Sequence, residues 1–477
     1  MYEQTPAQER GPGTPAVDVQ DFLNQHRFSP FQWSIFALCF LIVLLDGFDT
    51  AAIGFIAPSL LKEWGLSKAA LAPVLSAALF GLAAGGLTAG PCADRFGRKT
   101  VLVVAVALFG AACTWSAFSG SLTELTILRF VTGLGLGAAM PNAVTLMSEY
   151  CPDGRRATLT NAMFCGFPLG AALGGFVAAW MIPQWGWRSV LLLGGLVPLV
   201  LAVVMLMRLP ESVRWLVGRK VPVARIRAAL ARISASAREV QAFTMTEKTA
   251  GAAADADAAV KRTGLRVILS RPFIVGTVMI WLAYFMGLVI FYSLINWMPI
   301  LFKEAGLDAR TATLAASLFP LGGVGAVFLG VLMDRFNPNR VIALCFSLSA
   351  VSIYAIGLSA GSVGLLMTVV FVAGTLMNTA QSSLPALAAS FYPTQGRATG
   401  VAWMMGVGRF GGVAGSFLVA ELARRQVGFQ GIFAVVAVAG VFATLALLVK
   451  HWAHPDRPQA GPQEGEPAGR RSASLGH

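Results

Sequence analysis

Two carboxylates inside the first apolar stretch of the chain are the residues best placed to do chemistry. Asp46 and Asp49 lie in the middle of the apolar segment 31–58, in the run Asp-Gly-Phe-Asp. A carboxylate at this depth in a bilayer is costly unless it is protonated, paired or reached by water. Residues three positions apart share one face of a helix, so the two acids can hold a proton or a cation between them. We therefore predict that they lie on a proton or ion pathway, with a buried pairing to Arg129 or Arg409 as the alternative.

The composition of the chain is that of a membrane protein. Of its 477 residues, 56% are hydrophobic and 12% are charged, and the mean hydropathy is +0.69. A soluble domain usually carries about 25% charged residues. The six cysteines show neither metal-ligand spacing nor a disulfide framework, and the four histidines lie in or beside the polar terminal regions. We therefore expect no metal site, no cofactor and no enzymatic activity.

Twelve apolar segments are long enough to span a bilayer as helices. They fall into two groups of six, which predicts an all-α membrane protein with two six-helix halves. The segments are 31–58, 71–93, 100–119, 123–149, 157–182, 188–208, 273–301, 312–333, 341–360, 364–390, 398–423 and 429–452. The predicted parts are an N-terminal segment (1–30), an N-terminal half (31–208), a central linker (209–272), a C-terminal half (273–452) and a disordered tail (453–477).

The distribution of positive charge predicts the orientation. Most of the 36 Lys and Arg residues lie in the termini, the central linker and the loops on the same side. The positive-inside rule places that side, with both termini, in the cytoplasm. This bias and contact with acidic lipid account for the net charge of +13, so we expect no nucleic-acid partner. Residues 221–240 of the linker are basic and amphipathic, which predicts a helix on the inner leaflet.

An internal repeat follows the second and eighth apolar segments. The first copy is Gly90-Pro-Cys-Ala-Asp-Arg-Phe-Gly-Arg-Lys99, and the second is Gly330-Val-Leu-Met-Asp-Arg-Phe336. Parallel repeats build transporters whose substrate site lies between the halves. The aspartates can face the N-terminal end of a helix and the arginines can bond carbonyls and carboxylates, so these charges can hold two helices together reversibly. We call this predicted charge network the latch, and its expected residues are Gly90, Asp94, Arg95, Gly97, Arg98, Glu149, Arg155, Asp334, Arg335 and Arg397.

The first copy of the repeat resembles the signature loop of the major facilitator superfamily, and the six-plus-six layout extends the resemblance over almost the whole chain. Pro210-Glu211-Ser212 is similar to the motif at that site in sugar and organic-anion porters. The Asp-Gly-Phe-Asp run resembles the Asp-Gly-x-Asp motif of the aromatic acid:proton symporter family, and above all of its bacterial 4-hydroxybenzoate and protocatechuate carriers. Further charges that match this family are Arg129, Glu149, Arg397 and Arg409.

The resemblance implies a secondary active transporter that imports aromatic carboxylates such as 4-hydroxybenzoate, protocatechuate and benzoate-like acids. Import would be by proton symport with alternating access, so a proton gradient stands in place of a cofactor. The implied protein is a monomer in the bacterial inner membrane, and its partners are the ring acid, protons and membrane lipid. The alternative is a major facilitator carrier for another organic anion, a sugar or a drug.

A benzoate-like ligand needs a flat apolar slot and a cationic anchor for its carboxylate. Arg409 lies deep in a Gly-rich segment that leaves space beside it, and it either faces the central cavity or ties two helices together. Arg129 lies nearer to the outer face, where it either binds substrate or pairs with a buried acid. Both are candidate substrate anchors.

Buried amides and tyrosines complete the predicted substrate site. Asn378 and Gln381 are i, i+3 partners in the tenth segment, and Asn142 lies in the fourth. Each amide either donates to the ligand or holds helices together. Tyr284 and Tyr292 belong to the aromatic-rich seventh segment, where both stacking on a ring substrate and helix packing would explain them.

Overall fold

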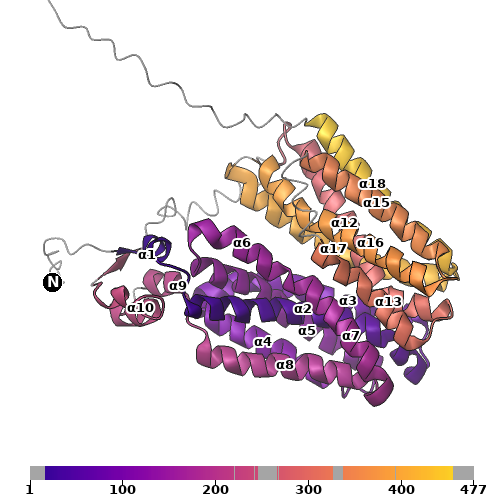
Figure 1. Ribbon diagram of the computed structural model, residues 1–477, viewed down its shortest axis with the longest axis horizontal. Helices are drawn as coiled ribbons and strands as arrows, with labels where there is room; N and C mark the ends of the chain where they lie inside the picture. The colour runs from indigo at the N-terminus through magenta and orange to yellow at the C-terminus, as the bar shows by residue number, and fades with distance from the viewer. Residues whose placement is uncertain are drawn as a thin grey trace, which may run out of the picture.

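The computed structural model is a bundle of long helices arranged in two groups (Figure 1). It describes residues 17–219, 221–240, 242–244, 266, 268–325, 337–392 and 394–454, with the backbone alone at 157, 161 and 394–398. The N-terminal group contains α2 (Pro30–Trp64), α3 (Lys68–Phe96), α4 (Arg98–Ser116), α5 (Leu122–Glu149), α6 (Asp153–Phe164), α7 (Gly166–Trp185) and α8 (Trp187–Arg208). The C-terminal group contains α12 (Ile274–Glu304), α13 (Ala309–Leu321), η2 (Gly322–Gly325), α15 (Pro338–Leu358), α16 (Val363–Phe391), α17 (Thr394–Arg424) and α18 (Phe429–Ala453).

The helices fall where the apolar segments predict them. Ten stretches of helix within the described residues are long and apolar enough to cross a membrane, and α6 and α7 together make one of them. The eleventh predicted segment is occupied by α17, whose glycines and Arg409 lower its mean hydropathy. The eighth begins with α13 and η2, and its last part, 326–333, lies outside the described residues. The all-α membrane fold is therefore confirmed, and the architecture is consistent with twelve spans.

Capping residues set the ends of the helix that carries the two acids. Ser29 begins α2 with a capping box, in which its hydroxyl accepts from the Gln32 amide while the Gln32 side chain accepts from the Ser29 amide. Gly65 ends the helix in the left-handed conformation, at φ 62°. Between these ends most of the helix is buried. The carboxylates therefore lie on an element that other helices hold on several sides.

The fifth predicted segment, 157–182, is one span broken into two helices. The break falls at Cys165, between α6 and α7. Pro168 lacks an amide proton and cannot donate to the carbonyl of residue 164, so the regular helical hydrogen bonding is interrupted there. Gly47 of α2 lies directly against the backbone of Phe167, so α7 passes α2 closely just beyond the break.

The linker and the N-terminal segment fold together against one end of the N-terminal half. Their elements are β1 (Val17–Asp18), α1 (Val19–Gln25), α9 (Val213–Gly218), α10 (Val223–Leu230), η1 (Ala235–Arg238) and β2 (Phe243–Thr244). β1 and β2 form a short parallel pair, and Asn24 contacts Asp153 at the start of α6. We call this the linker end of the molecule (Figure 1).

The basic helix predicted over 221–240 is shorter in the structure. Only 223–230 is α-helical, because Pro222 precedes it and the Ser234 hydroxyl accepts from the Ser236 amide, which favours a turn. Ile226 and Leu230 are buried against protein. The apolar face of α10 therefore covers the N-terminal half, and the position of this helix on the inner leaflet stays a prediction.

The two halves meet along three helix pairs, α2 with α12, α3 with α17, and α7 with α13. Gly54 lies so close to Ile295 that a Cβ at this position would clash with the Ile295 carbonyl. Beyond this point, at the end opposite to the linker, Lys68 forms an ion pair of 2.6 Å with Glu304 of the other half. These contacts join the halves from the middle of the bundle to its opposite end.

Candidate functional site

Asp49 is part of a buried ion pair between α2 and α5. Arg129 Nη1 donates to Asp49 Oδ1 at 2.7 Å and Nη2 donates to Oδ2 at 2.8 Å, which is a bidentate fork. The Cys113 thiol on α4 lies 3.3 Å from Asp49 Oδ1 and donates to it. Arg129 is 0% exposed and Asp49 is 1% exposed. Both carboxylate oxygens of Asp49 are thus occupied, and Arg129 is turned away from any open space.

Asp46, one turn earlier, has a different environment. The Thr50 hydroxyl is 3.5 Å from Asp46 Oδ1, at the limit for a hydrogen bond, and the residue is 4% exposed. Within the described part of the chain, no Lys or Arg lies within ion-pair distance of it. Arg409 and Tyr292 are close enough to act on it electrostatically. Asp46 therefore faces the other half, with its carboxylate uncommitted.

Arg409 approaches Asp46 from the C-terminal half. Its Nη1 donates to the Leu82 carbonyl of α3 at 2.6 Å, which places the guanidinium across the boundary between the halves. Gly86, which lies on α3 like Leu82, is next to the guanidinium and leaves space for it. Arg409 is half-buried, and apart from this carbonyl no partner is seen for it among the described residues. Its remaining donors are free to bind an anion.

The predicted tyrosines pack on both sides of Arg409. Tyr284 and Tyr292 of α12 lie against Gly408 and Gly412 of α17, where any larger side chain would collide with their rings. Tyr284, Tyr292 and Arg409 are all within electrostatic range of one another. We call Asp46, Arg409, Tyr284 and Tyr292 the central site. The small residues of α17 leave space for both aromatic rings.

The predicted amides differ in their relation to the central site. Gln381 Nε2 donates to the Tyr284 carbonyl at 3.4 Å, and its Oε1 is buried with no partner seen within the described chain. Asn378 donates to the Phe319 carbonyl at 3.3 Å and so ties α16 to α13. Asn142 donates at 2.8 Å to a carbonyl of its own helix. Gln381 therefore borders the central site, Asn378 joins helices, and Asn142 bonds within α5.

The structure places part of the latch together at the linker end. Arg98 Nη1 lies 3.0 Å from Asp94 Oδ1, and Arg98 Nε lies 3.7 Å from Glu149 Oε1, so this arginine links the ends of α3 and α5. Arg95 and Arg155 are exposed. Predicted latch residues outside the described part of the chain are Asp334, Arg335 and the side chain of Arg397.

The residues that hold this network together most directly come from the start of the linker. Glu211 Oε1 accepts from the Lys99 amide at 3.0 Å, at the N-terminus of α4, and the Ser212 hydroxyl donates to Glu149. Gly97 has φ 94° and leaves no space for a Cβ beside the Glu211 carboxylate. The signal in the sequence is the Pro-Glu-Ser motif at 210–212, which resembles a motif of other porters and does not by itself indicate a contact with the latch.

Tyr150 connects the same network to the backbone of the linker. Its hydroxyl donates to the Glu211 carbonyl at 2.6 Å. Burial, reinforced by the nearby charges of Glu149 and Glu211, raises the pKa of the Tyr150 phenol above its ordinary value, so the group stays protonated and donates. No group of three or more His, Cys, Asp or Glu side chains in the described chain is placed to hold a metal ion.

Sequence comparison relates the chain to known transporters. The family model of the Major Facilitator Superfamily matches residues 39–340 and 301–476. The chain is 50% identical over 444 residues to the 4-hydroxybenzoate transporter PcaK of Pseudomonas aeruginosa, covering 92% of this chain and 97% of the relative. It is 45% identical over 433 residues to a gallate transporter of Pseudomonas putida, covering 91% and 94%.

Structural comparison relates it to a sugar carrier of the same fold. The inward-open structure of the xylose transporter XylE from E. coli matches with a TM-score of 0.68 and 20% identity, covering 90% of this chain and 98% of that one. At this identity the similarity establishes the arrangement of helices.

Proposed function

The chain belongs to the Major Facilitator Superfamily, and from this premise we propose that it imports aromatic carboxylates by proton symport. The observation that carries the proposal is Arg409, a half-buried cation at the middle of the bundle whose one polar partner in the described chain is a backbone carbonyl. A cation with free donors at this depth favours an anionic ligand. The names of the similar proteins, 4-hydroxybenzoate and gallate transporters, fit a ring carboxylate as that ligand.

The central site supplies the remaining features of a ring-acid site. Tyr284 and Tyr292 offer aromatic faces beside the guanidinium, and the buried Oε1 of Gln381 can accept from a ring hydroxyl. The occupation of the Arg129 fork by Asp49 argues against Arg129 as the anchor. We assign Arg409 to the carboxylate and leave Arg129 a structural role.

Asp46 is the proposed proton carrier. When the substrate is absent, its carboxylate and the Arg409 guanidinium balance each other across the interface. Binding of an anion at Arg409 favours protonation of Asp46, because two negative groups would otherwise share one cation. Proton and substrate would therefore load together, and the protein would change between its open states only when both or neither are bound.

The contacts between the halves support an arrangement that is open toward the linker end. Among the described residues, the contacts between the halves lie from the middle of the bundle to the end opposite to the linker, at Arg409–Leu82, Gly54–Ile295 and Lys68–Glu304. We further propose a monomer in the bacterial inner membrane with both termini in the cytoplasm, which the distribution of positive charge supports. The linker end would then face the cytoplasm.

Competition between benzoate and benzamide tests the anchor. Uptake of labelled 4-hydroxybenzoate into vesicles with an imposed pH gradient should be inhibited far better by the acid than by the amide. Arg409→Ala and Arg409→Lys should lose this preference by roughly tenfold or more, because neither keeps the planar fork for a carboxylate.

A control just beyond the end of α17 isolates the effect of position. Arg425→Ala also removes one positive charge from the region of α17, but Arg425 is exposed and paired with Glu421, so it should keep the acid preference. Unchanged acid-over-amide selectivity in Arg409→Ala would contradict the assignment. Uptake of a sugar or a cation in place of ring acids by the unmodified protein would contradict the proposed substrate class.

A further inference from the structure

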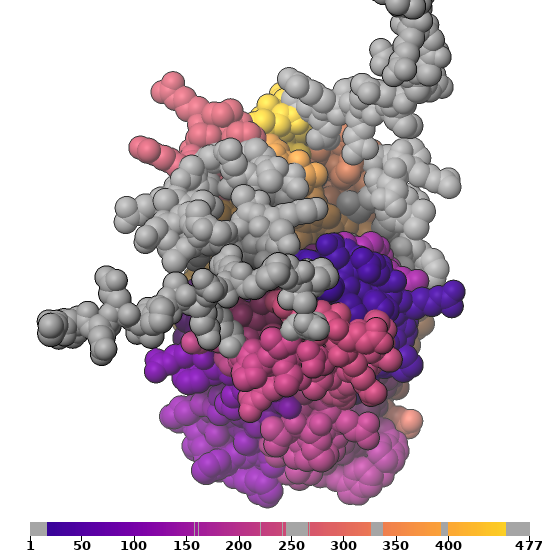
Figure 2. Space-filling model, turned by 90° about the vertical axis from the view of Figure 1, so that its left-hand side faces the viewer, coloured from indigo at the N-terminus to yellow at the C-terminus, as the bar shows by residue number. Residues whose placement is uncertain are grey.

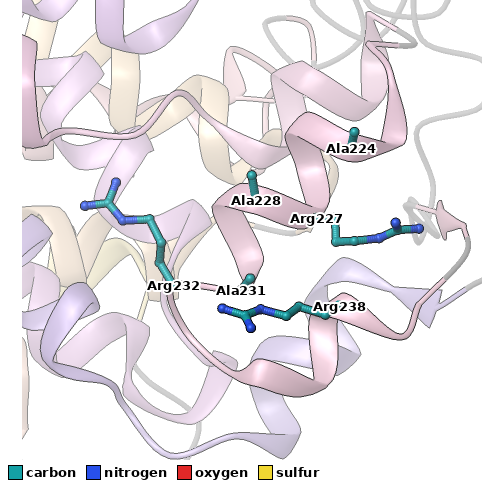
Figure 3. A pocket seen from close by; sticks show the side chains of 6 residues that line it. All are labelled: Ala224, Arg227, Ala228, Ala231, Arg232 and Arg238. Carbon is teal, nitrogen blue, oxygen red and sulfur yellow. The ribbon is translucent and has the colours of Figure 1, made fainter.

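A basic hollow lies on the linker, away from the central site. It has a volume of about 430 Å³, and its lining residues are Ala224, Arg227, Ala228, Ala231, Arg232 and Arg238 (Figure 3). The small alanines of α10 form one wall, and the arginines extend around the opening. Residues 221–240 contain four arginines and one acid, Glu239, so the local charge is strongly positive. We call this feature the basic hollow.

The three arginines are not equally committed to the fold. Arg227 donates from Nε and Nη2 to the Val240 carbonyl, at 3.2 and 2.9 Å. Arg232 reaches the Arg208 carbonyl only at 3.4 and 3.5 Å. For Arg238 no hydrogen bond or ion pair is seen with any described residue, and it is exposed. Arg232 and Arg238 extend to the same side in Figure 3, while Arg227 points the other way. Arg238 thus has no polar partner among the described residues, and Arg232 is held only by two long hydrogen bonds and keeps further donors.

The basic hollow lies beside the ends of the membrane-spanning helices. The Arg232 guanidinium sits 3.9 Å over the ring of Phe31, in the first turn of α2, and next to the last residue of α8, Arg208. Trp33, in the same turn of α2, is 49% exposed, as is typical of an aromatic side chain at a membrane surface. In Figure 2 the linker elements cover the end of the N-terminal half that faces the viewer. The hollow is therefore at the level where phospholipid headgroups would lie.

The apolar side chains of α10 are not free to insert into a membrane. Ile226 is 3% exposed and Leu230 is 0% exposed, because the apolar face of α10 packs on the protein. What the linker offers to a membrane surface is the guanidinium groups. A planar guanidinium matches the oxygens of a phosphate with two parallel hydrogen bonds, and an anionic leaflet concentrates such phosphates at this depth.

We propose that the basic hollow binds the headgroup phosphate of an anionic phospholipid through Arg232 and Arg238. The bound lipid would hold the linker, the start of α2 and the end of α8 at one position on the membrane surface. The proposal does not depend on which substrate the central site carries.

The test is lipid binding to the full-length protein purified in a neutral detergent. Phosphatidylglycerol should raise the temperature of thermal unfolding in a saturable manner, and phosphatidylcholine should not. The Arg232→Gln/Arg238→Gln variant should bind phosphatidylglycerol roughly 30-fold more weakly, since each surface arginine contributes about 1 kcal/mol to anionic lipid binding. Arg225→Gln is the matched control, because Arg225 lies exposed on α10 outside the hollow and its loss should change this affinity little.

Two further measurements keep the result decisive. The single variant Arg238→Glu reverses an exposed charge without removing the Arg232–Phe31 contact, and it should also weaken binding of phosphatidylglycerol. Inorganic phosphate should not reproduce the shift at the same concentrations. Equal effects of the two lipids, equal affinity in the double variant and the unmodified protein, or an equal shift with inorganic phosphate alone would each overturn the proposal.

Discussion

Asp46 and Asp49 are alike in sequence and lie on one helix, but their surroundings separate their roles. Asp49 is neutralised by the fork of Arg129 and a thiol, whereas Asp46 faces Arg409 across the boundary of the halves. The sequence predicted the two acids, both arginines and the alternatives between them. It could not decide which arginine pairs with which acid, because that depends on how the helices are rotated against one another.

Replacement of each acid by Asn should separate these roles. Asp49→Asn leaves Arg129 buried without its counter-charge, so we expect a loss of about 3–5 kcal/mol in the free energy of unfolding. Asp46→Asn removes no close ion pair and should cost at most about 1 kcal/mol. Both should abolish concentrative uptake. Thermal unfolding of the purified proteins and uptake into vesicles measure the two effects.

A double variant serves as the control for this reading. Asp49→Asn/Arg129→Gln removes both charges of the buried pair and should recover much of the stability that Asp49→Asn loses. An Asp46→Asn protein as unstable as Asp49→Asn, or one that still accumulates substrate against a gradient, would contradict the division of roles.

At the scale of elements, the end of α3 and the start of α4 are held by a residue distant in sequence. Glu211 follows α8, and its carboxylate lies at the N-terminus of α4. There it accepts a hydrogen bond from the Lys99 amide, and its negative charge interacts favourably with the positive end of the helix dipole. The first copy of the repeat could be recognised in the sequence from its charges. The contact of Glu211 could not be predicted, because packing alone brings this loop residue to a site more than a hundred positions away in the chain.

Substitutions at Glu211 should show how much this contact contributes. Glu211→Ala leaves the Lys99 amide without its acceptor, and we expect a loss of about 0.5–2 kcal/mol in stability together with a slower exchange of substrate across the membrane. Glu211→Gln keeps an acceptor oxygen and should lose about 0.3–1 kcal/mol. Unfolding and exchange at saturating substrate are the measurements, and an Ala variant that exchanges at the normal rate would argue against a role in the conformational change.

At the scale of the whole molecule, the membrane architecture followed from composition and segment length, since the bilayer requires both. The structure of the linker could not be predicted in this way. Its helix is shorter than its amphipathic pattern predicts, and β1 pairs with β2 across more than two hundred residues of chain. Such contacts depend on which surfaces the assembled halves leave available, and a local sequence pattern does not predict these surfaces.

The ion pair between Lys68 and Glu304 offers a test of the opening of the halves. These residues join the halves at the end opposite to the linker, so alternating access requires that they separate. Cysteines at both positions, in a Cys92→Ser background that removes the exposed thiol, should be linked by a short bifunctional thiol reagent, and the linked protein should lose most of its uptake. Each single cysteine variant treated in the same way is the control, and unimpaired uptake after complete cross-linking would contradict this movement.

The balance of charge in the bundle has an electrical consequence. The Asp49–Arg129 pair is neutral, and in the empty carrier Asp46 offsets Arg409. In the loaded carrier as we propose it, the substrate anion would offset Arg409 while Asp46 holds the proton, so neither crossing would move net charge if one proton accompanies each anion. Moving a single uncompensated charge through 100 mV would involve about 2.3 kcal/mol.

Membrane voltage should therefore do no work on this carrier. We expect a potassium diffusion potential imposed with valinomycin to leave initial uptake nearly unchanged at constant pH on both sides, while a pH gradient without voltage drives accumulation. Strong stimulation by an inside-negative potential would show that a second proton travels with the substrate. In the proposed mechanism, the cell would draw on the chemical part of its proton gradient and leave the electrical part untouched.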